Sequence, residues 1–450
     1  MRAAADALDA ALDDLVPVAM EESHLPRPRL TGEVGRTSGQ LRMFAAAVER
    51  GGVSGLVLDG AEPDASPVPR PDLRRMLVPV GPVLVFAASN FPFAFSVGGG
   101  DTASALAAGC PMVVKAHPGH PQTSRDTARV LRDGLVGAGA PEGVLGLVEG
   151  VDDGVTALQD RRIRAASFTG SVAGGTALHE IAASRPDPIP FHGELGSINP
   201  AVVTSAAAAV RGADLVTGFI NSFTLGVGQF CTKPGLLFLP VGHGLEDALA
   251  EATGAGTGPM LHDGIRGAFD SGVERLRKVA GVDVLAEGDG DAVDPRPTLL
   301  RTDVATFLAE ASILAEECFG PVSVVVEYDG TSELLEALDR IEGSLTSTLH
   351  AEDDEVERLG EVVTSLAARS GRLVWNGWPT GVAVSWAMQH GGPFPSTVGP
   401  AHTSVGVTAA RRFQRPVCYQ DTPQAALPPE LRDGNPLGLE RRVDGVVTTS

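Results

Sequence analysis

The sequence lacks several features that mark common classes of protein. It has four cysteines (Cys110, Cys231, Cys318 and Cys418), which lie far apart and form no C-x-x-C pair, so they indicate neither a zinc site nor a disulfide framework. No apolar run approaches the roughly 20 residues that a membrane-spanning helix needs. The start of the chain is an acidic helical pattern without the apolar core of a signal peptide. We therefore expect a cytoplasmic protein with free thiols.

Basic residues are also scarce. Lys and Arg together number 35 against 56 Asp and Glu, which gives a net charge of −21. Such an acidic surface repels nucleic acid and anionic membranes, so we expect neither as a partner. The hydrophobic content of 43% over 450 residues is ample for the cores of two to four domains of about 150 residues each.

The chain shows two successive α/β patterns. Helical patterns cover residues 2–21 and 35–48, and a proline-rich linker follows at 61–72. Apolar strand-like segments then alternate with helical patterns from residue 82 to 170, which predicts a doubly wound parallel sheet. A second alternation after Gly196 predicts another α/β domain. The tail from about residue 393 has a strand-like segment but no obvious core of its own, so we expect it to pack on its neighbours.

One stretch gathers residue types that could perform chemistry together. Glycines from Gly170 to Gly175 fall where a strand-like segment gives way to a helical pattern, and such a turn presents backbone N–H groups to an anion. Glu194 then stands in an apolar and glycine-containing segment. Cys231 follows in a glycine-flanked loop. A cysteine attacks as its thiolate, and a carboxylate within reach could deprotonate the thiol or a hydrolytic water.

The motifs in this stretch resemble the hallmarks of the aldehyde dehydrogenase superfamily. They are Phe168-Thr169-Gly170-Ser171, Glu194-Leu195-Gly196 and Gly228-Gln229-Phe230-Cys231, in that order. The resemblance implies an α/β fold with a Rossmann-type parallel-sheet cofactor domain, a second α/β catalytic domain and a small oligomerisation arm. It assigns residues 1–60 and 80–195 to the first, 196–397 to the second, and 61–79 and 398–450 to the arm. A homodimer or homotetramer is expected.

The resemblance implies three catalytic residues. Cys231 is the expected nucleophile, which attacks an aldehyde to form a thiohemiacetal and then a thioester. Glu194 is the expected base that activates the hydrolytic water, and the Asn90 amide is the expected donor to the oxyanion, together with the backbone N–H of Cys231. From the residues alone, Cys231 could be a packing cysteine, Glu194 a surface carboxylate and Asn90 a turn former.

The resemblance also implies NAD or NADP as cofactor. The residues expected to bind it are Lys115, Gly170, Ser171, Gly175, Glu317 and Phe319. Many NAD-specific relatives carry a glutamate where this chain has Pro118, and its loss removes repulsion towards a 2′-phosphate. The acidic loop at residues 149–153 offers no arginine for such a phosphate, so the choice of cofactor stays open. Ser89 stands where many relatives have a tryptophan close to the pyrophosphate.

The resemblance is strongest to the 2-oxoglutarate semialdehyde (2,5-dioxovalerate) dehydrogenase branch. It rests on segments such as SNFPFAFS, ELGSINP, GQFCTKPG, WNGWPTGV and HGGPFPST, and it spans residues 36–444. The substrate of that branch carries a carboxylate remote from the aldehyde. Arg36 and Gln40, four residues apart on one helical face, are the expected carboxylate binders, and Phe91 is expected to line the substrate channel. A solvated arginine and a core phenylalanine are the alternatives.

Other functions stay open at this stage. Cys231 could act with His192 in a cysteine hydrolase, the fold could be a non-catalytic scaffold, or the thioester could pass to coenzyme A. Glu194 favours hydrolysis over transfer to coenzyme A. Family members carry an additional N-terminal stretch ahead of the part that matches this chain. The aldehyde could therefore also differ from that of the branch.

Overall fold

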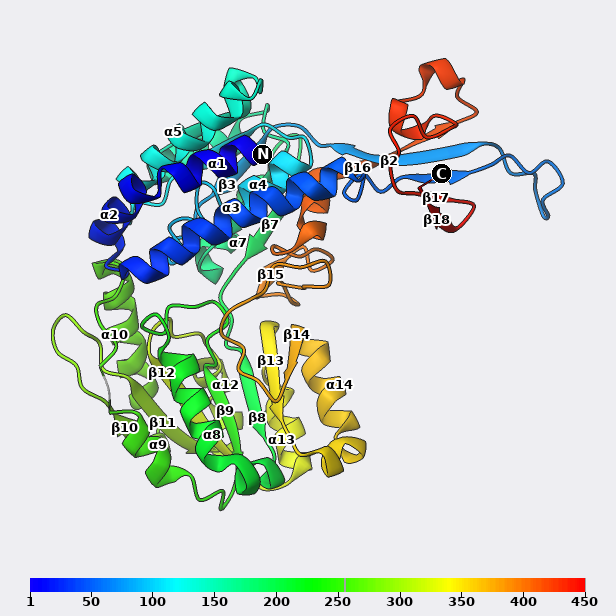
Figure 1. Cartoon of the computed structure of the whole chain (residues 1–450). Coiled ribbons are helices and arrows are strands. Elements are labelled where there is room, and N and C mark those ends of the chain that lie inside the picture. Colours follow the sequence, from blue (N-terminus) through cyan, green and yellow to red (C-terminus); the bar gives the residue numbers. More distant parts are fainter. Residues whose placement is uncertain (255, 450) are drawn as a thin grey trace.

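The computed structural model describes residues 1–254 and 256–449. Three sheets of six, seven and five strands organise the chain. Figure 1 shows the six- and seven-stranded sheets in two separate lobes, while the five-stranded sheet forms an arm that extends from the first lobe. The predicted α/β class is confirmed.

The six-stranded sheet is parallel except for one short edge strand. Its order is β15–β7–β6–β3–β4–β5, and β15 pairs antiparallel with β7. The strands are β3 (Val83–Phe86), β4 (Met112–Lys115), β5 (Leu145–Val148), β6 (Ala165–Thr169), β7 (Phe191–Glu194) and β15 (Thr397–Val398). The carboxyl ends of parallel strands share one edge, and Lys115, Thr169 and Glu194 therefore lie along it.

Helices cover this sheet as the alternation predicted. Those that follow the strands are α4 (Gly100–Ala107), α5 (Pro121–Gly137), α6 (Val151–Gln159) and α7 (Val172–Ala183). Ahead of them the chain forms α1 (Arg2–Ala10), α2 (Leu12–Ser23) and α3 (Arg27–Glu49). Leu8, Leu15 and Leu41 are buried in one core with Leu131 of α5, because their helical spacing puts them on inward faces. Among the described residues, no helix has the length and apolar character needed to cross a membrane.

The seven-stranded sheet forms the second lobe, in the order β10–β11–β12–β9–β8–β13–β14. Its strands are β8 (Pro200–Val203), β9 (Leu236–Pro240), β10 (Asp283–Glu287), β11 (Thr298–Asp303), β12 (Val322–Tyr328), β13 (Ser344–His350) and β14 (Ser370–Trp375). Its helices are α8 (Ser205–Thr224), α9 (Glu246–Ala252), α10 (Asp263–Arg277), α11 (Val304–Ala309), α12 (Ala311–Leu314), α13 (Thr331–Leu338) and α14 (Gly360–Arg369). The central strands are buried on both faces, which explains their continuous apolar sequences.

The arm combines segments from both ends of the chain. Its order is β16–β2–β1–β17–β18, with β1 (Val57–Asp59), β2 (Leu73–Pro79), β16 (Gln414–Gln420), β17 (Arg441–Val443) and β18 (Val446–Thr448). Because β1 pairs with β2 and β17, residues 57–59 belong to the arm sheet rather than to the parallel sheet. The short 3₁₀ helices are η1 (Glu142–Val144), η2 (Asp353–Arg358), η3 (Val407–Phe413), η4 (Gln424–Ala426) and η5 (Pro429–Leu431).

Candidate active site

Cys231 lies on a tight loop that follows α8. Gly226, Val227 and Gly228 all have positive φ, and a Cβ at Gly228 would stand 2.3 Å from the backbone carbon of Gly320. Glycine is therefore required at position 228 for two separate reasons. The Asn199 side chain holds this loop in place, because its Nδ2 donates to the carbonyl of Cys231 at 2.8 Å. Cys231 as a residue is neither fully buried nor exposed.

Glu194 is the last residue of β7 and is buried. Its carboxylate is oriented by two donors, because Ser404 Oγ donates to Oε2 and His390 Nε2 lies 3.1 Å from Oε1. The main chain on either side is also fixed: the Gly170 N–H donates to the Glu194 carbonyl at 3.0 Å, and the Leu195 N–H donates to that of Ser396 at 2.8 Å.

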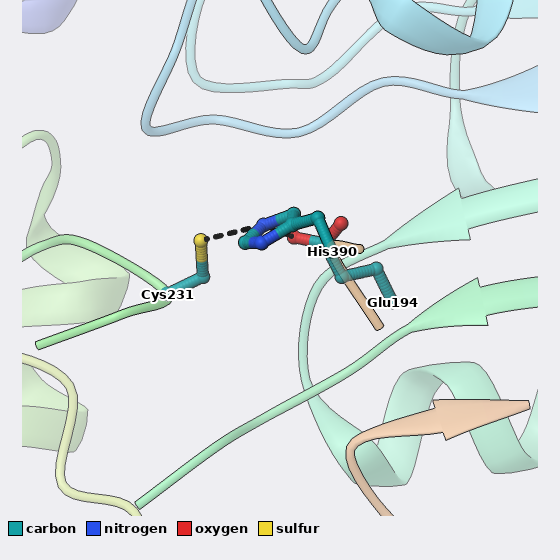
Figure 2. A group of neighbouring side chains, drawn as sticks. All are labelled: Glu194, Cys231 and His390. Atoms are coloured by element: carbon teal, nitrogen blue, oxygen red, sulfur yellow. Dashed lines mark hydrogen bonds and ion pairs between the residues drawn. The ribbon is translucent and has the colours of Figure 1, made fainter. Parts of the chain in front are cut away.

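His390 joins the nucleophile to the carboxylate, and the sequence reasoning did not single it out as a site residue. Its Nε2 lies 3.5 Å from Cys231 Sγ as well as 3.1 Å from Glu194 Oε1. Figure 2 shows the imidazole ring between the sulfur and the carboxylate. The side chain is fully buried. The structure thus brings Cys231 and Glu194 together, as expected, with a histidine in addition.

The charges at this centre oppose ionisation of the thiol. Burial raises the pKa of the Cys231 thiol well above its usual range, and the carboxylates of Glu194 and Glu317 act in the same direction. Arg36 acts in the opposite direction. Burial alone would also raise the pKa of Glu194, but His390, Ser404 and Arg412 outweigh it, so that pKa lies below its ordinary value. Cys231 is thus a thiol at rest beside an ionised carboxylate that can accept its proton.

Asn90 lies against the Cys231 loop, where its amide can serve an oxyanion. Its Nδ2 donates to the carbonyl of Gln229 at 3.0 Å. An amide has two N–H groups, so a second donor is left for an oxygen near Cys231. The carbonyl of Asn90 accepts from Arg29 Nη2 at 3.2 Å, which fixes the segment from the other side.

Aromatic rings and arginines lie beside Cys231. Phe91 contacts Phe95 and Phe230 edge to face, with centroids 5.2 and 5.1 Å away. The Arg36 guanidinium lies 5.1 Å from the centroid of Phe95, and that of Arg29 lies 4.4 Å from that of Phe91. Burial lowers the pKa of Arg36, while negative charge at Cys231 acts to raise it, which places this cation within electrostatic reach of the sulfur.

Gln40 and Arg372 lie on the two lobes, in α3 and β14. Gln40 is buried, and its side chain lies against Gly100 at the start of α4. Arg372, which the sequence reasoning missed, comes from β14 and also responds to charge at Cys231. Its Nη1 and Nη2 donate to the carbonyls of Gly381 and Pro379, and its Nε is buried with no hydrogen-bond partner in the described structure. No local motif marks Arg372, and only the tertiary structure shows that it lies near Cys231.

The predicted cofactor residues follow the carboxyl edge of the parallel sheet. Lys115 ends β4, and burial lowers its pKa. Ser171 Oγ caps α7 by accepting from the Gly174 N–H at 3.2 Å. Because the Gly170 N–H donates to Glu194, the free N–H groups of the first turn of α7, rather than that of Gly170, are available to a phosphate. These residues fit a dinucleotide that crosses the carboxyl ends of the strands.

Gly175 serves close packing. A Cβ at this position would stand 2.1 Å from Leu195 Cδ2, so the absence of a side chain brings α7 against the segment that follows Glu194.

The acidic loop after β5 does have an arginine beside it, since Arg125 of α5 pairs with Glu149 at 2.7 Å. Both NAD and NADP therefore stay compatible with this edge.

Glu317 and Phe319 lie on the loop before β12, close to the Cys231 loop. A Cβ at Gly196 would stand 2.6 Å from Glu317 Oε2, so this glycine allows the carboxyl group to approach. Desolvation raises the pKa of Glu317 to about 7. The buried Lys233 connects the two loops, because its Nζ donates to the carbonyls of Cys318 and Val322, both at 2.8 Å.

His192 does not pair with Cys231, which corrects the hydrolase alternative. Its ring packs on His402 and Phe413, with centroids 5.4 and 5.8 Å away, and neither ring nitrogen has a hydrogen-bond partner in the described structure. Burial lowers its pKa to about 3. Although His192 and Glu194 share β7, a different histidine, His390, reaches the sulfur.

Among the residues that the structure describes, two clusters have the residue types of a metal site. Ligand atoms of Glu194, Cys231 and His390 all lie within 4.8 Å of one another, but hydrogen bonds already join them. In the second cluster, His243 Nδ1 accepts from the Leu245 N–H at 2.9 Å, which places the proton on Nε2. That nitrogen lies 3.4 Å from Glu327 Oε1 and, because it carries the proton, has no lone pair for a metal.

Known proteins with similar sequences belong to the family that the motifs around Cys231 indicate. The model of the aldehyde dehydrogenase family matches residues 1–414. The alpha-ketoglutaric semialdehyde dehydrogenase of Acinetobacter baylyi is 42% identical over 440 residues, which cover 96% of this chain and 84% of that protein. Alpha-ketoglutaric semialdehyde dehydrogenase 2 of Azospirillum brasilense is 45% identical over 456 residues, or 99% and 86% of the two chains.

Solved structures share the fold at much lower identity. The NAD⁺ complex of an aldehyde dehydrogenase from Bacillus cereus superposes with a TM-score of 0.77 at 20% identity and covers 94% of this chain and 83% of that one. Lactaldehyde dehydrogenase from Escherichia coli has a TM-score of 0.76 at 22% identity, with coverages of 93% and 84%.

Proposed function

The chain belongs to the aldehyde dehydrogenase family, and we propose that its substrate is a small semialdehyde with a remote carboxylate, such as 2-oxoglutarate semialdehyde. As a member of this family, the protein oxidises aldehydes to carboxylic acids with NAD or NADP. Two relatives above 40% identity are named for alpha-ketoglutaric semialdehyde. The observation that carries the choice of substrate is the Arg36 guanidinium, which stacks on the aromatic wall within electrostatic reach of Cys231.

The residues around Cys231 support the following sequence of steps. The thiol proton passes to Glu194, and the sulfur attacks the aldehyde carbon to form a thiohemiacetal, whose oxyanion receives hydrogen bonds from Asn90 Nδ2 and the Cys231 N–H. A bound nicotinamide would accept the hydride from the thiohemiacetal carbon, and loss of this hydride leaves a thioester on Cys231. Once Glu194 is ionised again, it takes a proton from water, which attacks the thioester carbon and releases the acid and the thiolate.

The cofactor would be held by residues at the carboxyl edge of the parallel sheet. Lys115 is the proposed partner of the adenosine ribose, and the first turn of α7, including Ser171, is the proposed partner of the pyrophosphate. Glu317 is the proposed partner of the nicotinamide ribose, with Phe319 beside it. The buried cation of Lys115 and the capped N-terminus of α7 are compatible with these roles.

We also propose that the protein is a cytoplasmic homodimer or homotetramer. The arm extends away from both lobes and exposes apolar side chains, including Val446 and Val447. Exposed strands of this kind pair readily with a second copy. An aldehyde of another type and a non-catalytic scaffold are the alternatives, and the retention of Cys231, Glu194 and Asn90 in one site argues against the scaffold.

The substrate proposal can be tested with a panel of aldehydes and both cofactors, followed at the absorbance of the reduced nicotinamide. The decisive comparison is a carboxylated semialdehyde against an uncharged aldehyde of equal length, in the wild type and in Arg36→Gln. A charge-assisted hydrogen bond contributes roughly 1.5–3 kcal/mol, so kcat/KM for the carboxylated substrate should fall about ten- to a hundredfold, with little change for the uncharged one.

Arg27→Gln is the matched control, since Arg27 lies on the same helix and pairs with Asp13 at the surface. Equal losses on both aldehydes in Arg36→Gln would show that Arg36 has a structural role and would remove the support for a carboxylated substrate.

A further inference from the structure

His390 is held rigidly on the segment between β14 and β15. Its backbone N–H donates to Thr403 Oγ1 at 2.8 Å, and its carbonyl accepts from the Ser404 N–H at 2.9 Å. The ring is fully buried and faces Phe95, with centroids 6.3 Å apart. The imidazole therefore has a fixed position between the nucleophile and the base.

A single nitrogen of this ring serves both catalytic groups. Nε2 approaches Glu194 Oε1 and Cys231 Sγ, whereas Nδ1 is buried with no hydrogen-bond partner in the described structure. A ring nitrogen of imidazole either carries a hydrogen and donates or offers a lone pair and accepts, so the state of Nε2 decides what the residue can do.

The neighbours of Nε2 determine where the proton lies. An ionised carboxylate accepts hydrogen bonds and donates none, and the pKa of Glu194 lies below its ordinary value. Nε2 must therefore carry the hydrogen that is shared with Oε1. In this tautomer Nε2 has no lone pair for the thiol proton, which means that His390 is a donor at this centre and that Glu194 is the base.

We propose, on the basis of the roles assigned above to Cys231 and Glu194, that His390 is a catalytic residue whose Nε2–H transfers its hydrogen bond from the Glu194 carboxylate to the Cys231 sulfur when the nucleophile is activated. In this step the S–H bond of Cys231 breaks and an O–H bond forms on Glu194. The neutralised carboxyl group is then a weaker acceptor than the thiolate, so the donor turns to the sulfur.

The same donor returns to Glu194 later in the cycle. The sulfur of a thioester is neutral and a weak acceptor. After the proton on Glu194 has left to solvent, the carboxylate again accepts from Nε2–H and is oriented towards the hydrolytic water. His390 thus stabilises, in turn, whichever of the two groups carries the negative charge.

The test replaces His390 by Gln, whose Nε2 offers an N–H at a similar reach, and by Ala, which offers none. In the free enzyme, alkylation of Cys231 by iodoacetamide is measured against pH by mass spectrometry. Loss of a hydrogen bond to a charged group should raise the alkylation pKa of Cys231 by about one unit in His390→Ala and lower kcat on the order of ten- to a hundredfold. His390→Gln should restore most of both.

The exposed Cys418 supplies an internal control in the same digest, because its alkylation should be identical in all three proteins. An unchanged pH profile of Cys231 in His390→Ala, or a His390→Gln variant as impaired as His390→Ala, would overturn the proposal. Alkylation needs no aldehyde, so an incorrect choice of substrate would leave this result intact. A Cys231→Ser enzyme with full activity would instead refute the proposed mechanism.

Discussion

The two glutamates beside Cys231 have pKa values shifted in opposite directions. His390, Ser404 and Arg412 hold the pKa of Glu194 below its ordinary value, whereas desolvation raises the pKa of Glu317 to about 7. Groups whose environments separate their pKa values in this way usually have different roles. Glu194 is suited to accept protons throughout the neutral range. Glu317 instead changes charge within it, which should make cofactor binding sensitive to pH.

Cofactor affinity should therefore decrease as the pH falls through 7. The raised pKa means that Glu317 is protonated in the folded protein below about pH 7, and a protonated carboxyl group accepts ribose hydroxyls less well. We expect KM for the cofactor to increase several-fold between pH 8 and pH 6 in the wild type and to vary little in Glu317→Gln. Glu316→Gln, whose carboxylate lies at the surface with Arg275, is the control and should keep the pH dependence. The same pH dependence in Glu317→Gln would contradict this role.

At the scale of residues, local motifs predicted Cys231, Glu194 and Asn90, and the fold brings them together. His390 and Arg372 were missed because their proximity to Cys231 depends on the tertiary structure. The HGGPFPST segment was recognised as a feature of the branch, but a histidine before two glycines carries no local sign of catalysis. His192 is closer to Glu194 in sequence, yet its ring packs on His402 and Phe413.

At the scale of elements, the loop after α8 determines where the sulfur lies. Gly228 combines a φ of +64° with close contact to the backbone at Gly320. Sequence alternation predicted the longer strands and helices around this loop. It could not predict β1 and β15, because strands of three and two residues are too short to show a period.

Gly228→Ala should displace the nucleophile loop. Gly242→Ala is a matched control, since Gly242 also has a positive φ of +74° but has no atom within 4 Å of the added Cβ. Both variants carry the backbone strain, and Gly228→Ala adds the steric overlap. We expect it to be less stable than Gly242→Ala by about 1–3 kcal/mol in urea unfolding and to lose most activity. Equal stability of the two variants would mean that the loop relaxes without cost.

At the scale of the whole molecule, the arm exposes apolar side chains that the rest of the described chain does not cover. Its strand β18 lies at the edge of the five-stranded sheet, with Val446 67% and Val447 54% exposed. An edge strand with exposed valines favours association. The sequence indicated that the tail packs on its neighbours, but which strand would form the edge depends on pairing between distant segments.

Replacing both Val446 and Val447 by Asp should reduce the proposed oligomer to a smaller species. Charge on an exposed edge opposes pairing of the strand with a second chain. Light scattering coupled to size-exclusion chromatography measures the change in mass. Val210→Asp, at an equally exposed valine on α8, is the control and should leave the mass unchanged. An unaltered mass in the double variant would place the subunit contact elsewhere.

Lys233 has a consequence for how the enzyme can adapt to new substrates. Lys233 comes from the loop that carries the sulfur, and its buried ammonium group donates to the carbonyls of Cys318 and Val322, on the segment that follows Glu317. The spacing between the Cys231 loop and the segment before β12 is thereby set by contacts inside the protein rather than by a ligand. Evolution can then reshape the arginine and phenylalanine walls to admit a different aldehyde while the separation of these two loops stays constant.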